Sequence, residues 1–186
     1  MTSRCEWAEG NDLMEQYHDT EWGVPSHDDS HLFEMLVLEG SQAGLSWQTI
    51  LNKREGYRRA FANFDLATIS AYGESDVERL VQDPGIVRHR GKIEATIGNA
   101  NTALEVQAEF GSLDSYLWGL AGGKPVKNAP ATMANIEATT YASESMSKAL
   151  RKRGFRFVGP TTVYAFMQSA GMVNDHVVTC FRYNEV

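Results

Sequence analysis

The sequence is poor in residues that cross-link or stiffen small proteins, because only two cysteines and five prolines occur among its 186 residues. A single disulfide between Cys5 and Cys180 is conceivable, but free or metal-bound thiols in a reducing compartment fit so low a count better. A chain of this length buries about 70% of the surface that its unfolded form exposes, so it needs no disulfide framework. We therefore predict a single folded domain over residues 1–186.

Long apolar runs, alternating strand patterns, internal repeats and low-complexity tracts are also missing. No run approaches the roughly 18 apolar residues that a membrane span requires, and the polar first residues contain no secretory core. These absences lead us to expect a soluble, cytoplasmic monomer that has no membrane partner. Every segment with a clear hydrophobic period has the helical one, so the predicted fold class is all-α.

The sequence also lacks a general excess of positive charge, since its formal net charge is −7. Acidic proteins repel phosphate at long range, which argues against indiscriminate binding of polyanions. Two windows, residues 88–92 and 148–156, nevertheless hold eight of the 17 basic residues and no acidic one. Most such runs are simply solvated faces, so these windows indicate a function only if the fold gives them a common purpose.

The second basic window belongs to a predicted helix-hairpin-helix at about residues 143–171. Ser143 is placed to cap a helix that ends at Gly154, residues 155–159 form the hairpin, and Pro160 opens the next helix at its first position. The free N–H groups at that helix start form an anion site. The basic residues beside it would bind the phosphates of a DNA backbone without contacting the bases. An ordinary αα-hairpin with a tight turn has the same spacing. The candidate DNA-binding residues are Arg153, Gly159, Thr161 and Thr162.

A carboxylate is predicted to point into the core from the segment 32–51. Leu32, Met35 and Leu36 share a helical stripe with Glu39, which precedes the helix end at Gly40. A second helix then begins after Ser46 with Trp47. An unpaired buried carboxylate costs roughly several kcal/mol and is usually kept for a purpose, although Glu39 at a helix end has the alternative of turning outward into solvent.

The other expected elements follow the same periodicity. Gly56 is expected to end the helix that starts at Trp47, and residues 57–64 to form another. Further helices are expected at residues 12–18, 66–72, 76–82, 88–111 and 112–120. Residues 126–141 have no clear period and are expected to form a surface loop with one helical turn. A last short helix, capped by Asn174 or Asp175, would carry His176 and Cys180.

His176 and Cys180 are one helical turn apart, which suits two ligands of one metal ion. Cys5 and His18 offer a second thiolate and a second imidazole. Together the four residues would form a closed, structural tetrahedral zinc site that clips the N-terminal segment to the last helix. There are two alternatives to a zinc site. The spacing of His176 and Cys180 could arise by chance, or the same four residues could form a redox switch.

Several motifs in order resemble the family of bacterial DNA-3-methyladenine glycosylase I. They are Cys5 to Trp7, Tyr17 to Pro25, Leu38 to Trp47, Arg88 to Ile93, Gly154 to Gly159 and Asn174 to His176. The resemblance covers nearly the whole chain. It implies an all-helical, two-lobed fold of the helix-hairpin-helix glycosylase type, a structural zinc at the positions named above, and removal of 3-methyladenine from alkylated duplex DNA.

The resemblance also implies roles for single residues. A flipped-out 3-methyladenine would stack on Trp47, Tyr17 and Trp22, and Glu39 would act as the catalytic residue by accepting hydrogen bonds from its edge. The superfamily's catalytic aspartate position holds Asn174, although a shift of one residue would place Asp175 there. Thr161 stands where bifunctional relatives carry a lysine, so we predict an enzyme that releases the base without cutting the strand. A non-enzymatic binder of alkylated DNA is the competing hypothesis.

Overall fold

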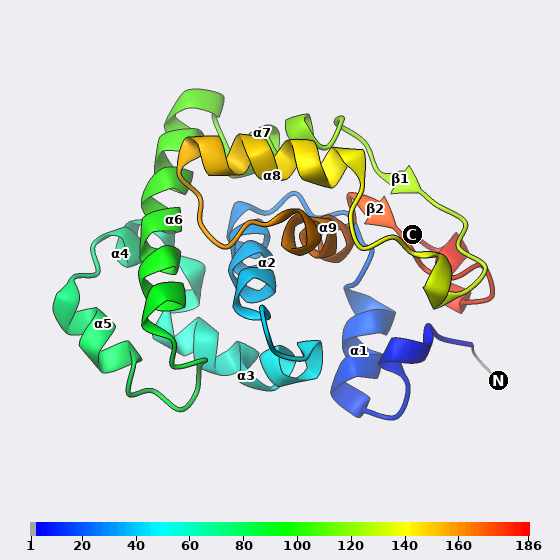
Figure 1. Cartoon of the computed structure of the whole chain (residues 1–186), viewed down its shortest axis with the longest axis horizontal. Helices are drawn as coiled ribbons and strands as arrows, with labels where there is room; N and C mark the ends of the chain where they lie inside the picture. Colours follow the sequence, from blue (N-terminus) through cyan, green and yellow to red (C-terminus); the bar gives the residue numbers. More distant parts are fainter. Residues whose placement is uncertain (1–2) are drawn as a thin grey trace.

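The computed structural model describes residues 3–186 as a helical protein (Figure 1). The helices are α1 (Asp12–Thr20), α2 (Asp29–Ser41), α3 (Trp47–Ala60), α4 (Leu66–Ser70), α5 (Glu74–Leu80), α6 (Arg90–Phe110), α7 (Leu113–Leu120), α8 (Tyr141–Arg153) and α9 (Pro160–Ser169). Single 3-10 turns cover Glu6–Ala8, Ala62–Phe64, Met133–Asn135 and Phe181–Asn184. A parallel pair of two-residue strands, β1 (Val126–Lys127) and β2 (Val173–Asn174), was not expected from the sequence. The helical fold class is confirmed, and residues 1 and 2 of the predicted domain lie outside the described part.

Helix α2 is the centre of the molecule. All its residues from Leu32 to Ser41 are buried, and it packs against α3, α6, α7 and α9. Asp28 caps its first turn, because its carboxylate accepts a hydrogen bond from the His31 backbone N–H at 2.7 Å. The predicted stripe with Glu39 therefore faces the core, and the helix runs one residue beyond Gly40.

The first described residues and the C-terminal segment lie at the same edge of the molecule, away from α4 and α5 (Figure 1). The Phe181 backbone N–H donates to the Ser3 carbonyl at 3.0 Å. Asn174 Nδ2 donates to the Val186 carbonyl at 2.7 Å. These contacts bring residues from both ends of the sequence to one place, as the zinc prediction required.

The predicted helix break at Gly56 is wrong, since α3 continues through this residue to Ala60. A Cβ atom on Gly56 would lie 2.0 Å from the Gly85 carbonyl oxygen, so the glycine permits a close backbone approach inside a continuous helix. The predicted helix over residues 57–64 is consequently wrong as well. The chain turns at Ala62, Asn63 and Phe64, which have left-handed backbone angles.

The predicted last helix is also wrong, because His176 lies just after β2 in chain without regular secondary structure. Cys180 returns to it through a turn closed by a 2.8 Å hydrogen bond from the Cys180 N–H to the Val177 carbonyl. The predicted loop with one helical turn is confirmed over residues 128–140, which contain the short turn Met133–Asn135, whereas its two ends belong to β1 and α8. Helices α8 and α9 form the expected helix-hairpin-helix, with Thr140 instead of Ser143 as the cap and with Pro160 at the first helical position.

Candidate base-binding pocket and metal centre

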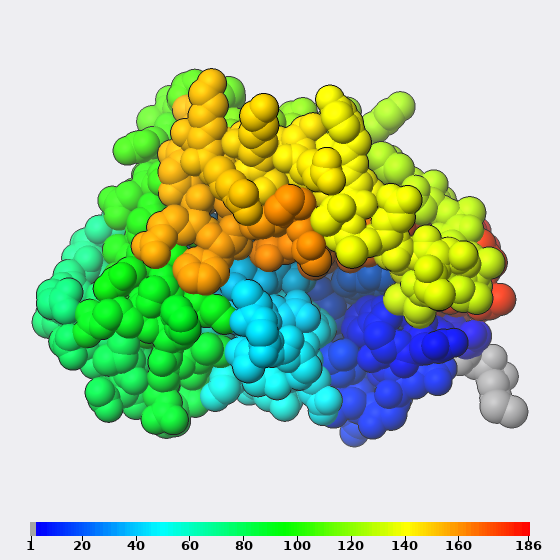
Figure 2. Space-filling view, viewed as in Figure 1, coloured from blue at the N-terminus to red at the C-terminus, as the bar shows by residue number. Residues whose placement is uncertain are grey.

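A pocket of about 410 Å³ opens between the N-terminal segment, the end of α2, the start of α3 and helix α9. Figure 2 shows the face on which these segments meet, with the loop around residues 133–138 bordering the N-terminal segment. The lining side chains are Trp7, Met14, Tyr17, Trp22, Glu39, Gln42, Trp47, Met133, Ile136, Glu137, Ala138, Thr161, Tyr164, Ala165 and Gln168. This size and the five aromatic side chains in the lining are typical of sites for small flat ligands.

Glu39 projects from the last turn of α2 into this pocket and is only 6% exposed. Burial raises the pKa of its carboxyl to about 8, and the neighbouring Ser169 hydroxyl opposes that rise. Both the neutral acid and the charged carboxylate of Glu39 are therefore populated near neutral pH. A cation bound beside it would favour the charged form.

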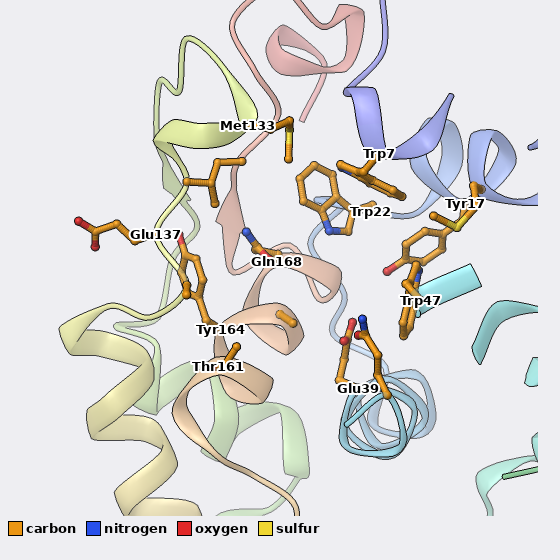
Figure 3. Close-up of a pocket in the computed structure, with 15 residues that line it drawn as sticks. Trp7, Tyr17, Trp22, Glu39, Trp47, Met133, Glu137, Thr161, Tyr164 and Gln168 are labelled. Carbon is orange, nitrogen blue, oxygen red and sulfur yellow. The ribbon is translucent and has the colours of Figure 1, made fainter. Parts of the chain in front are cut away.

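Tyr17 and Trp47 bring two buried hydrogen-bond donors to the same side of the pocket (Figure 3). Within residues 3–186, neither the Tyr17 hydroxyl nor Trp47 Nε1 has a hydrogen-bond partner. Their ring centroids are 5.4 Å apart at an angle of 51°. A buried donor without a partner costs about 1–3 kcal/mol, so this wall is built to receive the polar edge of a ligand.

Trp7 and Trp22 form a second aromatic wall, with centroids 5.1 Å apart and rings nearly perpendicular. Trp22 is one of the predicted site residues, whereas Trp7 is named from the sequence only as the end of the motif from Cys5 to Trp7. Met133, Ile136 and Glu137 close the pocket from the loop before α8 (Figure 3). Their contribution was not predicted, because that loop has no periodicity that fixes where it packs.

Behind the α9 side of the pocket lies the buried carboxylate of Asp175. It accepts hydrogen bonds from the Tyr164 hydroxyl at 2.6 Å, from Gln168 Nε2 at 2.7 Å and from Asn128 Nδ2 at 2.7 Å. The side-chain amide of Asn174 is hydrogen-bonded to the C-terminal segment instead, because it donates to the Tyr183 and Val186 carbonyls. Asp175 is thus the acid nearest the pocket in this segment, but it reaches the pocket only through Tyr164 and Gln168.

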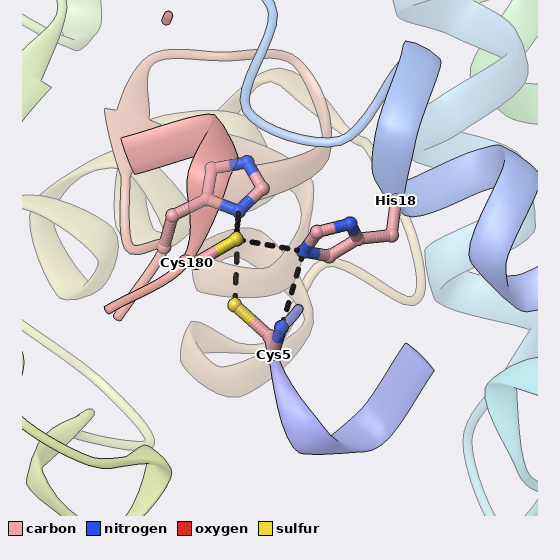
Figure 4. Close-up of side chains that lie close together, drawn as sticks. Cys5, His18 and Cys180 are labelled. Atoms are coloured by element: carbon pink, nitrogen blue, oxygen red, sulfur yellow. Dashed lines mark hydrogen bonds between the residues drawn. The ribbon is translucent and has the colours of Figure 1, made fainter. Parts of the chain in front are cut away.

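Cys5, His18, His176 and Cys180 form a buried cluster whose candidate ligand atoms all lie within 4.8 Å of one another (Figure 4). Cys180 Sγ is 3.4 Å from His18 Nε2 and 3.5 Å from His176 Nδ1, and Cys5 Sγ is 3.7 Å from His176 Nδ1. Zinc bonds of about 2.0–2.3 Å in tetrahedral geometry imply ligand separations of this size. The group could therefore hold a metal ion.

The other ring nitrogen of each imidazole is already engaged. His18 Nδ1 lies 2.8 Å from Asp19 Oδ1, and His176 Nε2 lies 3.0 Å from the Trp22 carbonyl. These oxygens accept, so the ring protons sit there and leave His18 Nε2 and His176 Nδ1 unprotonated. The lone pairs of these two atoms can bind a cation, although His18 Nε2 also accepts a 3.4 Å hydrogen bond from the Cys5 N–H. Burial raises the pKa of Cys5 to about 12, so a metal ion must displace the thiol proton.

The predicted DNA-binding residues fall into two places. Gly159, Thr161 and Thr162 lie at the start of α9, and Thr161 also lines the rim of the pocket. Arg153 instead faces α6, where Arg153 Nη2 donates to Glu109 Oε1 at 2.8 Å. Its guanidinium also lies 4.9 Å from the centre of the Phe110 ring. Binding of a phosphate by Arg153 would have to compete with this ion pair.

No helix within residues 3–186 combines the length and the apolar character needed to cross a membrane.

Comparison with known proteins gives a consistent result. A model of the methyladenine glycosylase family matches residues 7–183. Over 180 residues the chain is 51% identical to DNA-3-methyladenine glycosylase 1 of Escherichia coli (strain K12). The alignment covers 97% of this chain and 96% of that protein. A crystal structure of a 3-methyladenine DNA glycosylase I superposes with a TM-score of 0.94 at 50% identity, covering 96% of this chain and 98% of that one. A variant of such an enzyme in complex with 3-methyladenine superposes with a TM-score of 0.93 at 34% identity, covering 96% of each chain.

Proposed function

This chain belongs to the methyladenine glycosylase family, and we propose that it excises 3-methyladenine from alkylated double-stranded DNA by hydrolysing the N-glycosidic bond. The observation that carries the proposal is the pocket in which the buried Glu39 faces two donors without partners, Tyr17 and Trp47. A purine edge offers both donors and acceptors, so it complements this arrangement. The aromatic walls suit a flat, positively charged ring.

The chemistry needs little help from strong acids or bases. Methylation at N3 places a positive charge on the base in the nucleotide, so the base leaves as a neutral molecule without prior protonation. The enzyme must flip the nucleotide out of the duplex, at a cost of roughly a few kcal/mol, and hold it. Glu39 would accept hydrogen bonds from the base and balance its charge, the Tyr17 hydroxyl and Trp47 Nε1 would donate to its edge, and the Trp22 ring would pack on its face.

None of the fifteen residues that line the pocket in the described part of the chain is a lysine, which supports a monofunctional hydrolase. Strand cleavage through a Schiff base requires an amine beside the sugar, and Thr161 offers a hydroxyl at the rim. Borohydride treatment of the enzyme on methylated DNA should therefore trap no covalent adduct. A trapped adduct would refute this part of the proposal.

One assay separates the enzyme from the competing binder of alkylated DNA. Incubation with methylated duplex DNA should release free 3-methyladenine, detected by chromatography. Glu39→Ala should abolish this release while the helical circular dichroism and the affinity for undamaged duplex remain nearly unchanged. Full release by the Glu39→Ala variant would contradict the assigned role, and no release by the unaltered protein would favour the binder.

We further propose that the buried Cys2His2 group holds one structural Zn²⁺, bound by Cys5, His18, His176 and Cys180. A complete set of four protein ligands leaves no open position for a substrate or a water molecule, which suits a structural site. The thiolate ligands require a reducing compartment, in keeping with a cytoplasmic protein. A single domain that acts as a monomer completes the proposal, and light scattering of the purified protein tests the monomer.

A further inference from the structure

The hairpin between α8 and α9 contains a residue in an unfavourable backbone conformation. Phe157 has a φ of +56°, in the left-handed region that glycine adopts freely. For a bulky residue this conformation costs of the order of 1–3 kcal/mol and persists where function requires it. The chain places a glycine with φ +106° three residues earlier, at Gly154. A phenylalanine at position 157 therefore needs its own explanation.

The shape of the hairpin does not depend on the phenyl ring. Asn99 of α6 holds Arg156 through two hydrogen bonds, one to its carbonyl at 3.0 Å and one from its N–H at 2.8 Å. On the other side of Phe157, the Ser147 hydroxyl donates to the Val158 carbonyl at 2.6 Å. The Phe157 backbone also packs on Gly40, where an added Cβ would lie 3.1 Å from the Phe157 oxygen.

The ring also contributes little to the core, since Phe157 is 36% exposed. It meets the edge of the exposed His89 ring, with centroids 6.3 Å apart and an interplanar angle of 83°. Arg88 and Arg156, the sequence neighbours of these two residues, are exposed and form no ion pair within the described chain. We call Arg88, His89, Arg156 and Phe157 the hairpin patch.

The hairpin patch adjoins the base pocket. Phe157 packs on Gly40, and the residue before Gly40 in α2 is Glu39. Figure 2 shows the hairpin beside the segment that follows α2, on the face where the pocket segments meet. A strand whose damaged nucleotide enters the pocket would therefore pass close to this patch. Its chemistry, two cations beside aromatic rings, matches alternating phosphates and apolar deoxyribose faces.

We propose that Phe157 is a direct DNA contact: its ring packs on a deoxyribose of the duplex next to the flipped nucleotide, and Arg88 and Arg156 pair with the flanking phosphates. This inference rests on the proposed function and extends its DNA surface from the hairpin backbone to the start of α6. The strain at Phe157 is then retained because glycine, which would relieve it, offers no surface to the sugar.

The proposal predicts opposite effects of one substitution on the stability of the fold and on the affinity for DNA. Phe157→Gly relieves the strain and removes the ring, so its Tm should be equal to or above that of the unaltered protein. Affinity for a duplex with a central abasic-site analogue, measured by fluorescence anisotropy at fixed salt, should fall about tenfold, in line with loss of one aromatic contact. Phe157→Tyr should keep the affinity. Binding of free 3-methyladenine, followed by tryptophan fluorescence, should not change.

Phe110 provides a matched control at the opposite end of α6. It is also exposed, at 40%, and in Phe110→Ala the Glu109 pairing of Arg153 stays in place, so DNA affinity should not change. Arg156→Ala should lower the salt dependence of binding by about one counterion, whereas Phe157→Gly should leave it unchanged.

Two results would overturn the inference. One is a DNA affinity of Phe157→Gly within twofold of the unaltered protein. The other is a loss of DNA affinity that comes with a lower Tm and weaker base binding, since the ring would then act through the fold. Release of 3-methyladenine by the unaltered protein, measured in the same samples, distinguishes either result from failure of the proposed function.

Discussion

The Trp22 carbonyl accepts a hydrogen bond from His176 Nε2 at 3.0 Å, and the two rings meet edge to face with centroids 4.6 Å apart. His176 belongs to the candidate metal cluster, and the Trp22 indole lines the base pocket. Trp7 makes a similar contact with His18, at 5.5 Å between centroids. The candidate metal cluster therefore supports the Trp7–Trp22 wall of the pocket from behind. Disruption of the cluster should displace these two rings and weaken base binding.

Removal of the proposed Zn²⁺ should thus lower both stability and base affinity. We expect Cys180→Ser, or prolonged chelation, to reduce the free energy of unfolding by at least about 3 kcal/mol, or roughly 6–12 °C in Tm. Binding of 3-methyladenine should weaken in the same samples, and added Zn²⁺ should restore the chelated protein but not the variant. Elemental analysis without metal and a Tm insensitive to chelation would instead favour the redox alternative.

The buried carboxyl of Glu39 should make stability depend on pH. Its pKa is about 8 in the fold against 4.5 for the free side chain, so the folded state retains a proton that the unfolded state releases. The free energy of unfolding should therefore be highest, as far as this group contributes, below pH 4.5, and decline as the pH rises to about 8. Glu39→Gln does not titrate. The stability difference between Glu39→Gln and the unaltered protein, measured by urea unfolding, should grow through this window and then level off.

The same group should shape the pH dependence of excision. A cationic base pairs with the carboxylate and not with the neutral acid, so kcat/KM on methylated DNA should rise with pH to a plateau above about 8. The Glu39→Gln variant should lose at least about tenfold in activity and should lack this rising limb. A rising limb that persists in Glu39→Gln would assign it to another group.

Gly56 shows what periodicity alone could not reveal. A glycine after an amphipathic helical stretch favours a helix end. That prediction fails at Gly56, where the turn that contains Gly85 packs against the helix backbone. The stripe through Glu39 and the helix start at Trp47 were predictable, since both depend on neighbours within one or two turns. The Met133 side of the pocket was not, because its position depends on contacts across the whole chain.

A pair of glycine substitutions tests this explanation. Gly56→Ala would put a Cβ 2.0 Å from the Gly85 oxygen and should destabilise the fold by about 3 kcal/mol. Gly98→Ala is the control in α6, where no atom lies within 4 Å of the added Cβ, and it should stabilise by about 0.5–1 kcal/mol. Thermal unfolding measures both. Equal effects of the two substitutions would show that helix propensity, and not the close approach, decides.

Asp175 offers a test of positioning against charge. Because Gln168 Nε2 and the Tyr164 hydroxyl donate to this carboxylate, Asp175→Ala frees both pocket side chains and should lower 3-methyladenine affinity about tenfold. Asp175→Asn retains an acceptor for these two donors, and the Asn128 amide can turn its oxygen toward the new NH₂ group.

We therefore expect Asp175→Asn to keep most of the base affinity and most of the single-turnover excision rate. If the negative charge itself acted on the sugar, Asp175→Asn would bind the base normally but excise it as slowly as Asp175→Ala. In a Gln168→Ala, Tyr164→Phe background, Asp175→Ala should then have little further effect on base binding, because a positioning residue acts only through the side chains that it holds. A full additional loss in that background would mean that Asp175 reaches the base by another route.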